Sequence, residues 1–66
     1  MGAQNLKPKA KARELYNSII IAEKNRISHD DVINICRTIL DQCISYAKDE
    51  YLDYLNEVKN ALNDIE

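Results

Sequence analysis

The sequence predicts an all-α fold, and three observations lead to that prediction. The chain has 66 residues with a single Gly and a single Pro, and both of these (Gly2 and Pro8) precede residue 9. Strands need frequent turns, and turns depend heavily on Gly and Pro. From residue 9 onward, apolar residues recur three and four positions apart, which is the spacing of one helix face. A chain of this length forms one domain, which we place at residues 8–66.

The first helix is expected over about residues 9–25, after a flexible basic arm of residues 1–7. Pro8 suits the first position of a helix because its missing N–H is not needed there. The apolar residues that follow form one stripe, which consists of Ala12, Leu15, Tyr16, Ile19 and Ala22. Ile20 and Ile21 extend the apolar surface beyond that stripe, so this helix is expected to have neighbours on two sides.

The second helix is expected to begin directly after Ser28, and the turn before it to lie near residues 26–28. Ser28 is a good N-cap, and Asp31 follows three residues later, which approximates a capping box. Ile27 and Val32 occupy the two positions of a hydrophobic staple. These signals make the start of the second helix the clearest local prediction in the sequence.

The remaining apolar residues allow two arrangements. They keep a three-four spacing almost to the end of the chain, through Ile33, Leu40, Ile44, Ala47, Tyr51, Tyr54, Val58, Ala61 and Ile65. Without an interruption they predict a helical hairpin whose second helix has about 36 residues and a length of ~54 Å. No other helix of the chain is long enough to cover it, so this version requires a dimer.

The alternative is a small three-helix bundle in which the chain breaks near Lys48 and Asp49. The three helices then span about residues 9–25, 29–47 and 50–65. Each of the last two segments begins with acidic residues and has a basic residue near its end, which suits two separate helix dipoles. The absence of Gly, Pro or Asn at the proposed turn argues against the break. Charge placement favours the three-helix bundle, and we expect the protein to be dimeric.

No segment carries a catalytic, metal-binding or cofactor motif. His29, Cys36 and Cys43 follow a seven-residue spacing, which separates neighbours by about 10.5 Å along a helix. That distance is too long for a shared metal ion or an intrachain disulfide, so we expect buried reduced thiols and no metal or cofactor. With one His and little chain to enclose a substrate, we expect neither an enzyme nor a small-molecule substrate.

Charge is unevenly distributed along the chain, although the net charge is only −2. A basic cluster near the start consists of Lys7, Lys9, Lys11 and Arg13. No aromatic side chain is interleaved with these residues, and residues 49–66 are strongly acidic, so nucleic-acid binding is not expected. The longest apolar run covers only residues 19–22, so we expect no membrane segment and a cytoplasmic location.

These features predict a protein that works by binding another protein chain, because the helices carry more apolar surface than one copy readily hides. The expected partner-binding residues are Ile19, Ile20, Ile21, Tyr46, Tyr51 and Tyr54. Tyrosines are enriched at binding hot spots because the ring packs while the hydroxyl stays in water. We expect a small regulator or inhibitor. A dimerisation or assembly domain of a larger protein is the alternative.

Two short segments resemble parts of known helical proteins. The segment AEKNRISHDDVINIC, residues 22–36, resembles the turn of the helical hairpin by which Sin-family repressors and antirepressors pair. In that family, too, Ile-Ser is followed, after one residue, by two acids and an aliphatic residue. The segment ARELYNSIII, residues 12–21, is similar to the first helix of small immunity proteins against peptide bacteriocins. The likenesses imply an antirepressor-like or immunity-like role, but they are local and assign the chain to no family.

Overall fold

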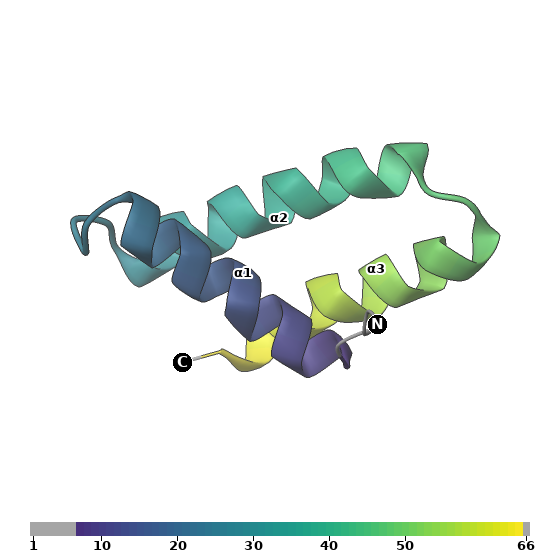
Figure 1. Cartoon of the computed structure of the whole chain (residues 1–66), viewed down its shortest axis with the longest axis horizontal. Coiled ribbons are helices and arrows are strands. Elements are labelled where there is room, and N and C mark those ends of the chain that lie inside the picture. The colour runs from purple at the N-terminus through teal and green to yellow at the C-terminus, as the bar shows by residue number, and fades with distance from the viewer. Residues whose placement is uncertain (1–6, 66) are drawn as a thin grey trace, which may run out of the picture.

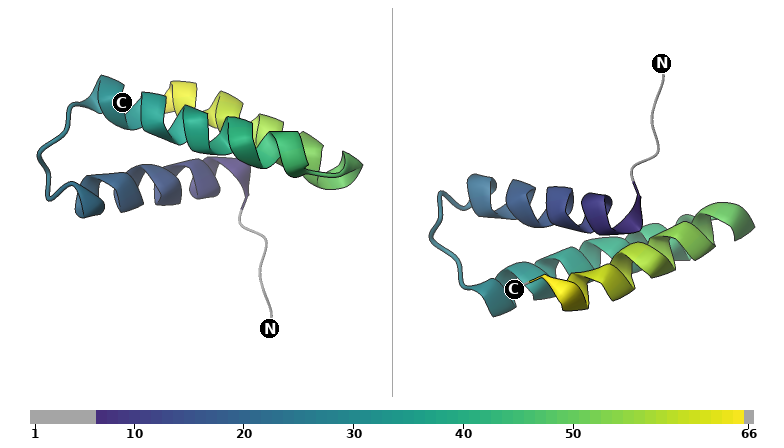
Figure 2. Two further views of the ribbon diagram at one scale, coloured as in Figure 1. Left: turned by 90° about the horizontal axis from the view of Figure 1, so that it is seen from above. Right: turned by 90° about the horizontal axis from the view of Figure 1, so that it is seen from below.

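Three α-helices and a short 3-10 helix make up the fold in the computed structural model, which describes residues 7–65 (Figure 1). The elements are α1 (Pro8–Ala22), α2 (His29–Tyr46), α3 (Asp49–Ala61) and η1 (Leu62–Asp64). α2 and α3 run antiparallel, and α1 packs against both of them from one side (Figures 1 and 2). The prediction of an all-α fold is confirmed over the described residues.

The break between α2 and α3 lies at Ala47 and Lys48, so the hairpin with one long second helix is wrong. Both residues have extended backbone angles, with φ and ψ of −79° and 152° at Ala47 and of −97° and 169° at Lys48. Any residue adopts this conformation, so the turn needs no Gly, Pro or Asn. The objection to a break at this point therefore does not apply.

The turn between α1 and α2 starts earlier than predicted, because α1 ends at Ala22 rather than near Asn25. Lys24 and Asn25 have φ values of 53° and 64°, in the left-handed region. The Asn25 N–H donates to the Ile20 carbonyl and the Lys24 N–H donates to the Ile21 carbonyl, each at 3.0 Å. This is the bonding of a Schellman motif, which satisfies the last carbonyls of a helix without Gly.

The start of α2 agrees with its prediction. The Asp31 N–H donates to the Ser28 hydroxyl at 3.2 Å, so Ser28 is the N-cap. Val32 is fully buried and Ile27 is half-buried against the core, as expected for a hydrophobic staple. The cap and the staple together fix the direction in which α2 leaves the turn.

The core lies where the three helices and η1 meet, and aliphatic residues dominate it. Its buried members are Ala12, Val32, Cys36, Leu40, Leu55, Val58, Leu62 and Ile65. Val58 and Ile65 of the predicted seam are buried, and Tyr54 and Ala61 pack against the core, whereas Tyr51 is exposed. The inward face of α3 and η1 is wider than the predicted seam, because Leu55 and Leu62 are buried as well.

Candidate protein-binding surface

Two polar contacts fix the side of α2 that faces α3. Nζ of Lys59 in α3 donates to Oδ1 of Asp41 at 2.5 Å, and Nη2 of Arg37 donates to Oδ1 of Asn63 at 2.9 Å. Arg37 and Asp41 are four residues apart, so they lie on one side of α2. They are also the two charged residues that α2 carries after its first turn. The side chains of Arg37 and Asp41 therefore both point to the α3 side of α2.

The opposite side of α2 carries a row of apolar residues that we call the α2 stripe, which consists of Ile35, Ile39, Cys43 and Tyr46. Ile39 and Cys43 are each two residues from Asp41, or about 200° around the helix, so they project away from α3. Ile35 is half-buried, whereas Ile39, Cys43 and Tyr46 are exposed. The side chain of Tyr46 keeps 88% of its surface accessible.

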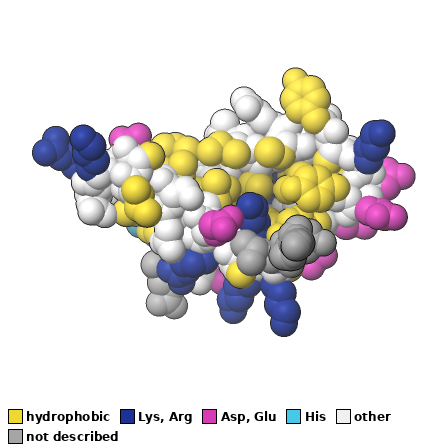
Figure 3. Space-filling view, in the orientation of Figure 1, with side chains coloured by type: hydrophobic (Ala, Val, Ile, Leu, Met, Phe, Trp, Pro, Cys, Tyr) yellow, Lys and Arg dark blue, Asp and Glu magenta, His cyan; other side chains and the backbone are white. Residues whose placement is uncertain are grey.

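The direction of α1 explains why the α2 stripe is uncovered. α1 lies beside the first part of α2 and then runs across toward α3, so no described helix covers the second half of α2 on this side (Figures 1 and 2). In the space-filling view, hydrophobic side chains form a band over α2 that extends toward the end where α2 and α3 join, and charged side chains lie at that end (Figure 3). The exposed apolar surface is therefore continuous with the core between the helices.

Tyr51 and Tyr54 lie at the start of α3 and stack on each other, with ring centroids 5.7 Å apart and planes 17° from parallel. Tyr54 is half-buried against the core, whereas Tyr51 is 55% exposed. Lys11 of α1 lies near this pair. The pKa of Lys11 is raised, chiefly by its hydrogen bond to Glu14 and to a lesser degree by the two tyrosines. The pair therefore adds aromatic surface at the end of the bundle where α1 begins.

The structure does not gather the six predicted partner-binding residues into one surface. Ile19 and Ile20 are half-buried against the core. Ile21 is 75% exposed, but it lies at the end of α1 beside the first turn. Tyr46 lies at the other end of α2, about 25 Å away along the helix. The residues that connect these ends, from Ile35 to Cys43, were not among those predicted.

The two thiols have different environments. Cys36 is buried, and burial raises the pKa of its thiol. Cys43 is exposed, so the expectation that both thiols are buried is wrong for this residue, because its position lies on the uncovered side of α2. Both cysteines are free. Within residues 7–65, no group of three or more His, Cys, Asp or Glu side chains is arranged to hold a metal ion.

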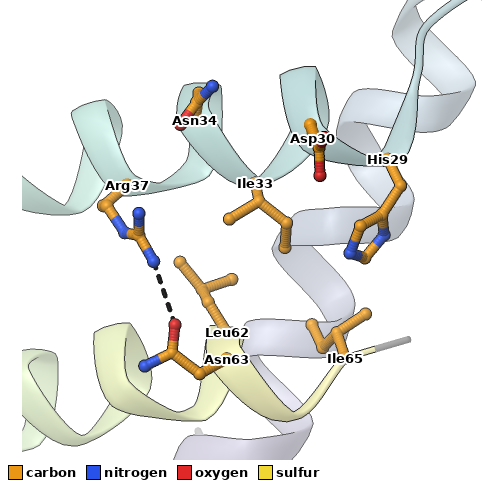
Figure 4. Close-up of a pocket in the computed structure, with 8 residues that line it drawn as sticks. All are labelled: His29, Asp30, Ile33, Asn34, Arg37, Leu62, Asn63 and Ile65. Atoms are coloured by element: carbon orange, nitrogen blue, oxygen red, sulfur yellow. Dashed lines mark hydrogen bonds between the residues drawn. The ribbon is translucent and has the colours of Figure 1, made fainter.

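A hollow of about 400 Å³ lies between the start of α2 and the end of the chain (Figure 4). Its eight lining residues are His29, Asp30, Ile33, Asn34, Arg37, Leu62, Asn63 and Ile65. The aliphatic side chains form its centre, and the bond between Arg37 and Asn63 closes one end. Tyr16 Oη lies 2.8 Å from Nδ1 of His29, which ties this ring to α1. Asp30 is the one carboxylate in the lining, so these residues offer no carboxylate pair for acid–base chemistry.

The four basic residues near the start of the chain differ in their surroundings. Lys7 has extended backbone at the N-cap of α1, and the other three lie within the helix. Nζ of Lys11 makes an ion pair with Glu14 at 2.9 Å, whereas Lys9 and Arg13 are exposed. Residues 1–6 of the predicted flexible arm lie outside the described residues. No described helix is long and apolar enough to span a membrane.

Comparison of the chain with models of known protein families finds no match. Neither the curated proteins nor the solved structures contain a match. The two local likenesses noted in the sequence therefore carry no argument about function, and the proposal below is based on the surface alone.

Proposed function

We propose that this chain is a small helical interaction module that binds another protein chain through the α2 stripe, with Tyr51 at the edge of the contact. The observation that carries the proposal is the placement of charge on α2. Its charged residues after the first turn bond to η1 (Arg37) and α3 (Asp41), and its uncovered side presents Ile39, Cys43 and Tyr46. Solvent-facing sides of helices usually carry the charged residues instead.

The dimensions of the α2 stripe suit a helical partner. Ile35 to Tyr46 spans about 16 Å, or three helical turns, which is the length over which an amphipathic helix lies along a groove or a second helix. Fully burying one large aliphatic side chain contributes about 1.5–3 kcal/mol. Tyr46 and Tyr51 add rings that pack while their hydroxyls stay in water.

A module that binds through an apolar surface exerts its effect on the protein that it binds, so we propose a regulatory or inhibitory role. The two free cysteines support a reducing compartment such as the cytoplasm, because an exposed thiol like that of Cys43 is prone to oxidation elsewhere. The predicted dimeric state belongs to this proposal as one form of protein binding.

Affinity capture from cells that express the chain natively tests the proposal, with three baits. Ile39→Glu places a charge in the middle of the α2 stripe, at a side chain that is 36% exposed. Asn56→Glu is the matched control, because it adds the same charge at an exposed position of α3. We expect the wild type and Asn56→Glu to capture the same protein and Ile39→Glu to lose it. Equal capture by all three baits would refute the assigned surface.

A further inference from the structure

We propose that the hollow between the start of α2 and the end of the chain binds a short, extended peptide segment. In this segment an aliphatic residue lies between a basic residue and an acidic residue. The hollow and the α2 stripe lie on different sides of α2, because Ile35 is two residues, or about 200° around the helix, from both Ile33 and Arg37. The hollow is therefore a second binding site, and it does not depend on the proposed function.

The two ends of the hollow carry opposite charges. Asp30 and Arg37 both line it and are seven residues apart on α2, so they lie on one side of the helix and about 10.5 Å apart along it. In the close-up, the side chains of Asp30, Ile33 and Arg37 extend from α2 toward η1 (Figure 4). Within residues 7–65, neither Asp30 nor Arg37 makes an ion pair. A ligand that complements both needs a cation and an anion about 10 Å apart.

The guanidinium of Arg37 fixes the end at which the acidic group of the ligand binds. It is half-buried, and its Nη2 donates to Oδ1 of Asn63 at 2.9 Å, which holds it at the edge of the hollow. A guanidinium has five N–H donors, and the described part of the chain gives Arg37 no other acceptor. A carboxylate accepts two of these N–H groups side by side. The acidic residue of the peptide therefore binds at Arg37 and the basic residue at Asp30.

The remaining lining residues favour a peptide over a hydrocarbon or a free amino acid. Asn34 and Asn63 supply carboxamides, which have the same donor and acceptor groups as a peptide backbone. The Asn34 carboxamide has no hydrogen bond to any described residue. Ile33, Leu62 and Ile65 supply an aliphatic floor between the two charges. A free amino acid carries both charged groups on one carbon atom, which is too close for Asp30 and Arg37 to bind both.

The spacing of the two charges sets the length of the peptide. An extended chain rises about 3.3 Å per residue, and alternate side chains point to the same side. In a five-residue segment the first, third and fifth side chains therefore face the hollow, with the outer two about 13 Å apart. Long charged side chains bend inward to reach Asp30 and Arg37. The volume of about 400 Å³ lies within the range of ligand sites, which is about 300–1,000 Å³.

The test is an NMR titration of the isotope-labelled full chain with capped pentapeptides whose ends are uncharged. The mixed-charge probes are Lys-Ala-Leu-Ala-Glu and its reverse, and the comparison probes are Glu-Ala-Leu-Ala-Glu and Lys-Ala-Leu-Ala-Lys. We expect a mixed-charge probe to bind with a Kd of about 1 mM or below and to shift the side-chain amide signals of Asn34 and Asn63. Its affinity should be about 3- to 5-fold higher than that of either comparison probe, because each exposed ion pair contributes up to about this factor.

Charge-reversed variants should change the preferred probe. Asp30→Lys leaves two cations in the lining and should prefer the probe with two Glu. Arg37→Glu leaves two anions and should prefer the probe with two Lys. Each variant gains affinity for one probe, and loss of folding produces no such gain. Asp31→Lys is the matched control, because it makes the same charge change in the same helical turn but lies four residues before Ile35, on the stripe side. We expect it to keep the wild-type preference.

Three results would overturn the inference. The first is the absence of amide shifts at about 10 mM of either mixed-charge probe. The second is equal affinity of the wild type for all the probes. The third is an Asp31→Lys variant that changes its preference as Asp30→Lys does. Ile39→Glu should leave the affinity for the mixed-charge probe unchanged, so the hollow and the α2 stripe are tested separately.

Discussion

Asp41 of α2 is joined to Lys59 of α3 by an ion pair, and Ile39 and Cys43, two residues before and two residues after Asp41, project away from α3. Ile39 and Cys43 consequently face a side of α2 that α1 reaches only in its first part. The contact is partly exposed to solvent, so its own contribution to stability is small, about 1 kcal/mol or less. Its importance is that it shows which side of α2 faces α3, and therefore which apolar residues of α2 lie on the other side.

Ser28→Ala should lower the free energy of unfolding by about 1 kcal/mol, because the Asp31 N–H loses its acceptor at the start of α2. Urea unfolding followed by circular dichroism measures this loss. Ser18→Ala is the control, since the Ser18 hydroxyl bonds to the Glu14 carbonyl inside α1 and caps nothing. We expect the control to change stability by less than about 0.5 kcal/mol. Equal losses in the two variants would contradict the capping role.

Lys24→Gly should stabilise the protein by about 0.5 kcal/mol. Lys24 has a φ of 53°, and a left-handed conformation costs a residue with a Cβ roughly 1–2 kcal/mol that Gly does not incur. The greater freedom of Gly in the unfolded chain offsets part of the gain. The same change at Arg13, in the middle of α1, should instead destabilise by about 0.8 kcal/mol. A loss of stability in Lys24→Gly would show that the turn does not have this conformation.

Leu62→Ala should remove about 2–5 kcal/mol of stability, because Leu62 is 1% exposed and its side chain fills the space between η1 and the helices. A chain of this length has roughly 3–10 kcal/mol in total, so the variant should be largely unfolded in mild denaturant. Leu52→Ala, at a half-buried position of α3, is the comparison and should cost less. Similar losses at both positions would contradict the assigned core.

Cys36 should make the stability fall at alkaline pH. Burial raises the pKa of its thiol above the ordinary value of 9.0, so the unfolded chain releases this proton at a lower pH than the folded chain. The stabilisation is complete below that ordinary pKa and is lost as pH rises through the higher folded value. Unfolding free energies should therefore decline less steeply above about pH 9 in Cys36→Ala than in Cys43→Ala. Equal slopes in the two variants would contradict a buried Cys36.

Local signals in the sequence were sufficient to predict the helices and one of the turns. Ser28, Asp31 and the staple formed by Ile27 and Val32 are all within five residues of one another, and local geometry decides them. The break at Ala47 and Lys48 was favoured by charge placement alone. Its extended backbone cannot be predicted from residue type, because every residue adopts that conformation.

The candidate surface could be predicted only in part, because it depends on the path of α1. The spacing of Ile35, Ile39, Cys43 and Tyr46 is visible in the sequence, but so is the second apolar line of α2 through Val32, Cys36 and Leu40. Which line is buried depends on where α1 and α3 pack, and this is a tertiary property. Tyr46 and Tyr51 were identified by residue type. The structure adds that Ile35, Ile39 and Cys43 form one apolar row with Tyr46.

Site-specific photocross-linking in the native cells tests the partner-binding role of the α2 stripe most directly. A benzophenone amino acid is introduced in turn in place of Ile39, Tyr46 and, as the control, Asn56. Positions 39 and 46 should each form a covalent adduct with the same protein chain, whether a second copy or a different protein, and position 56 should form none. Absence of adducts at positions 39 and 46, or an identical adduct from position 56, would contradict the assignment of this surface.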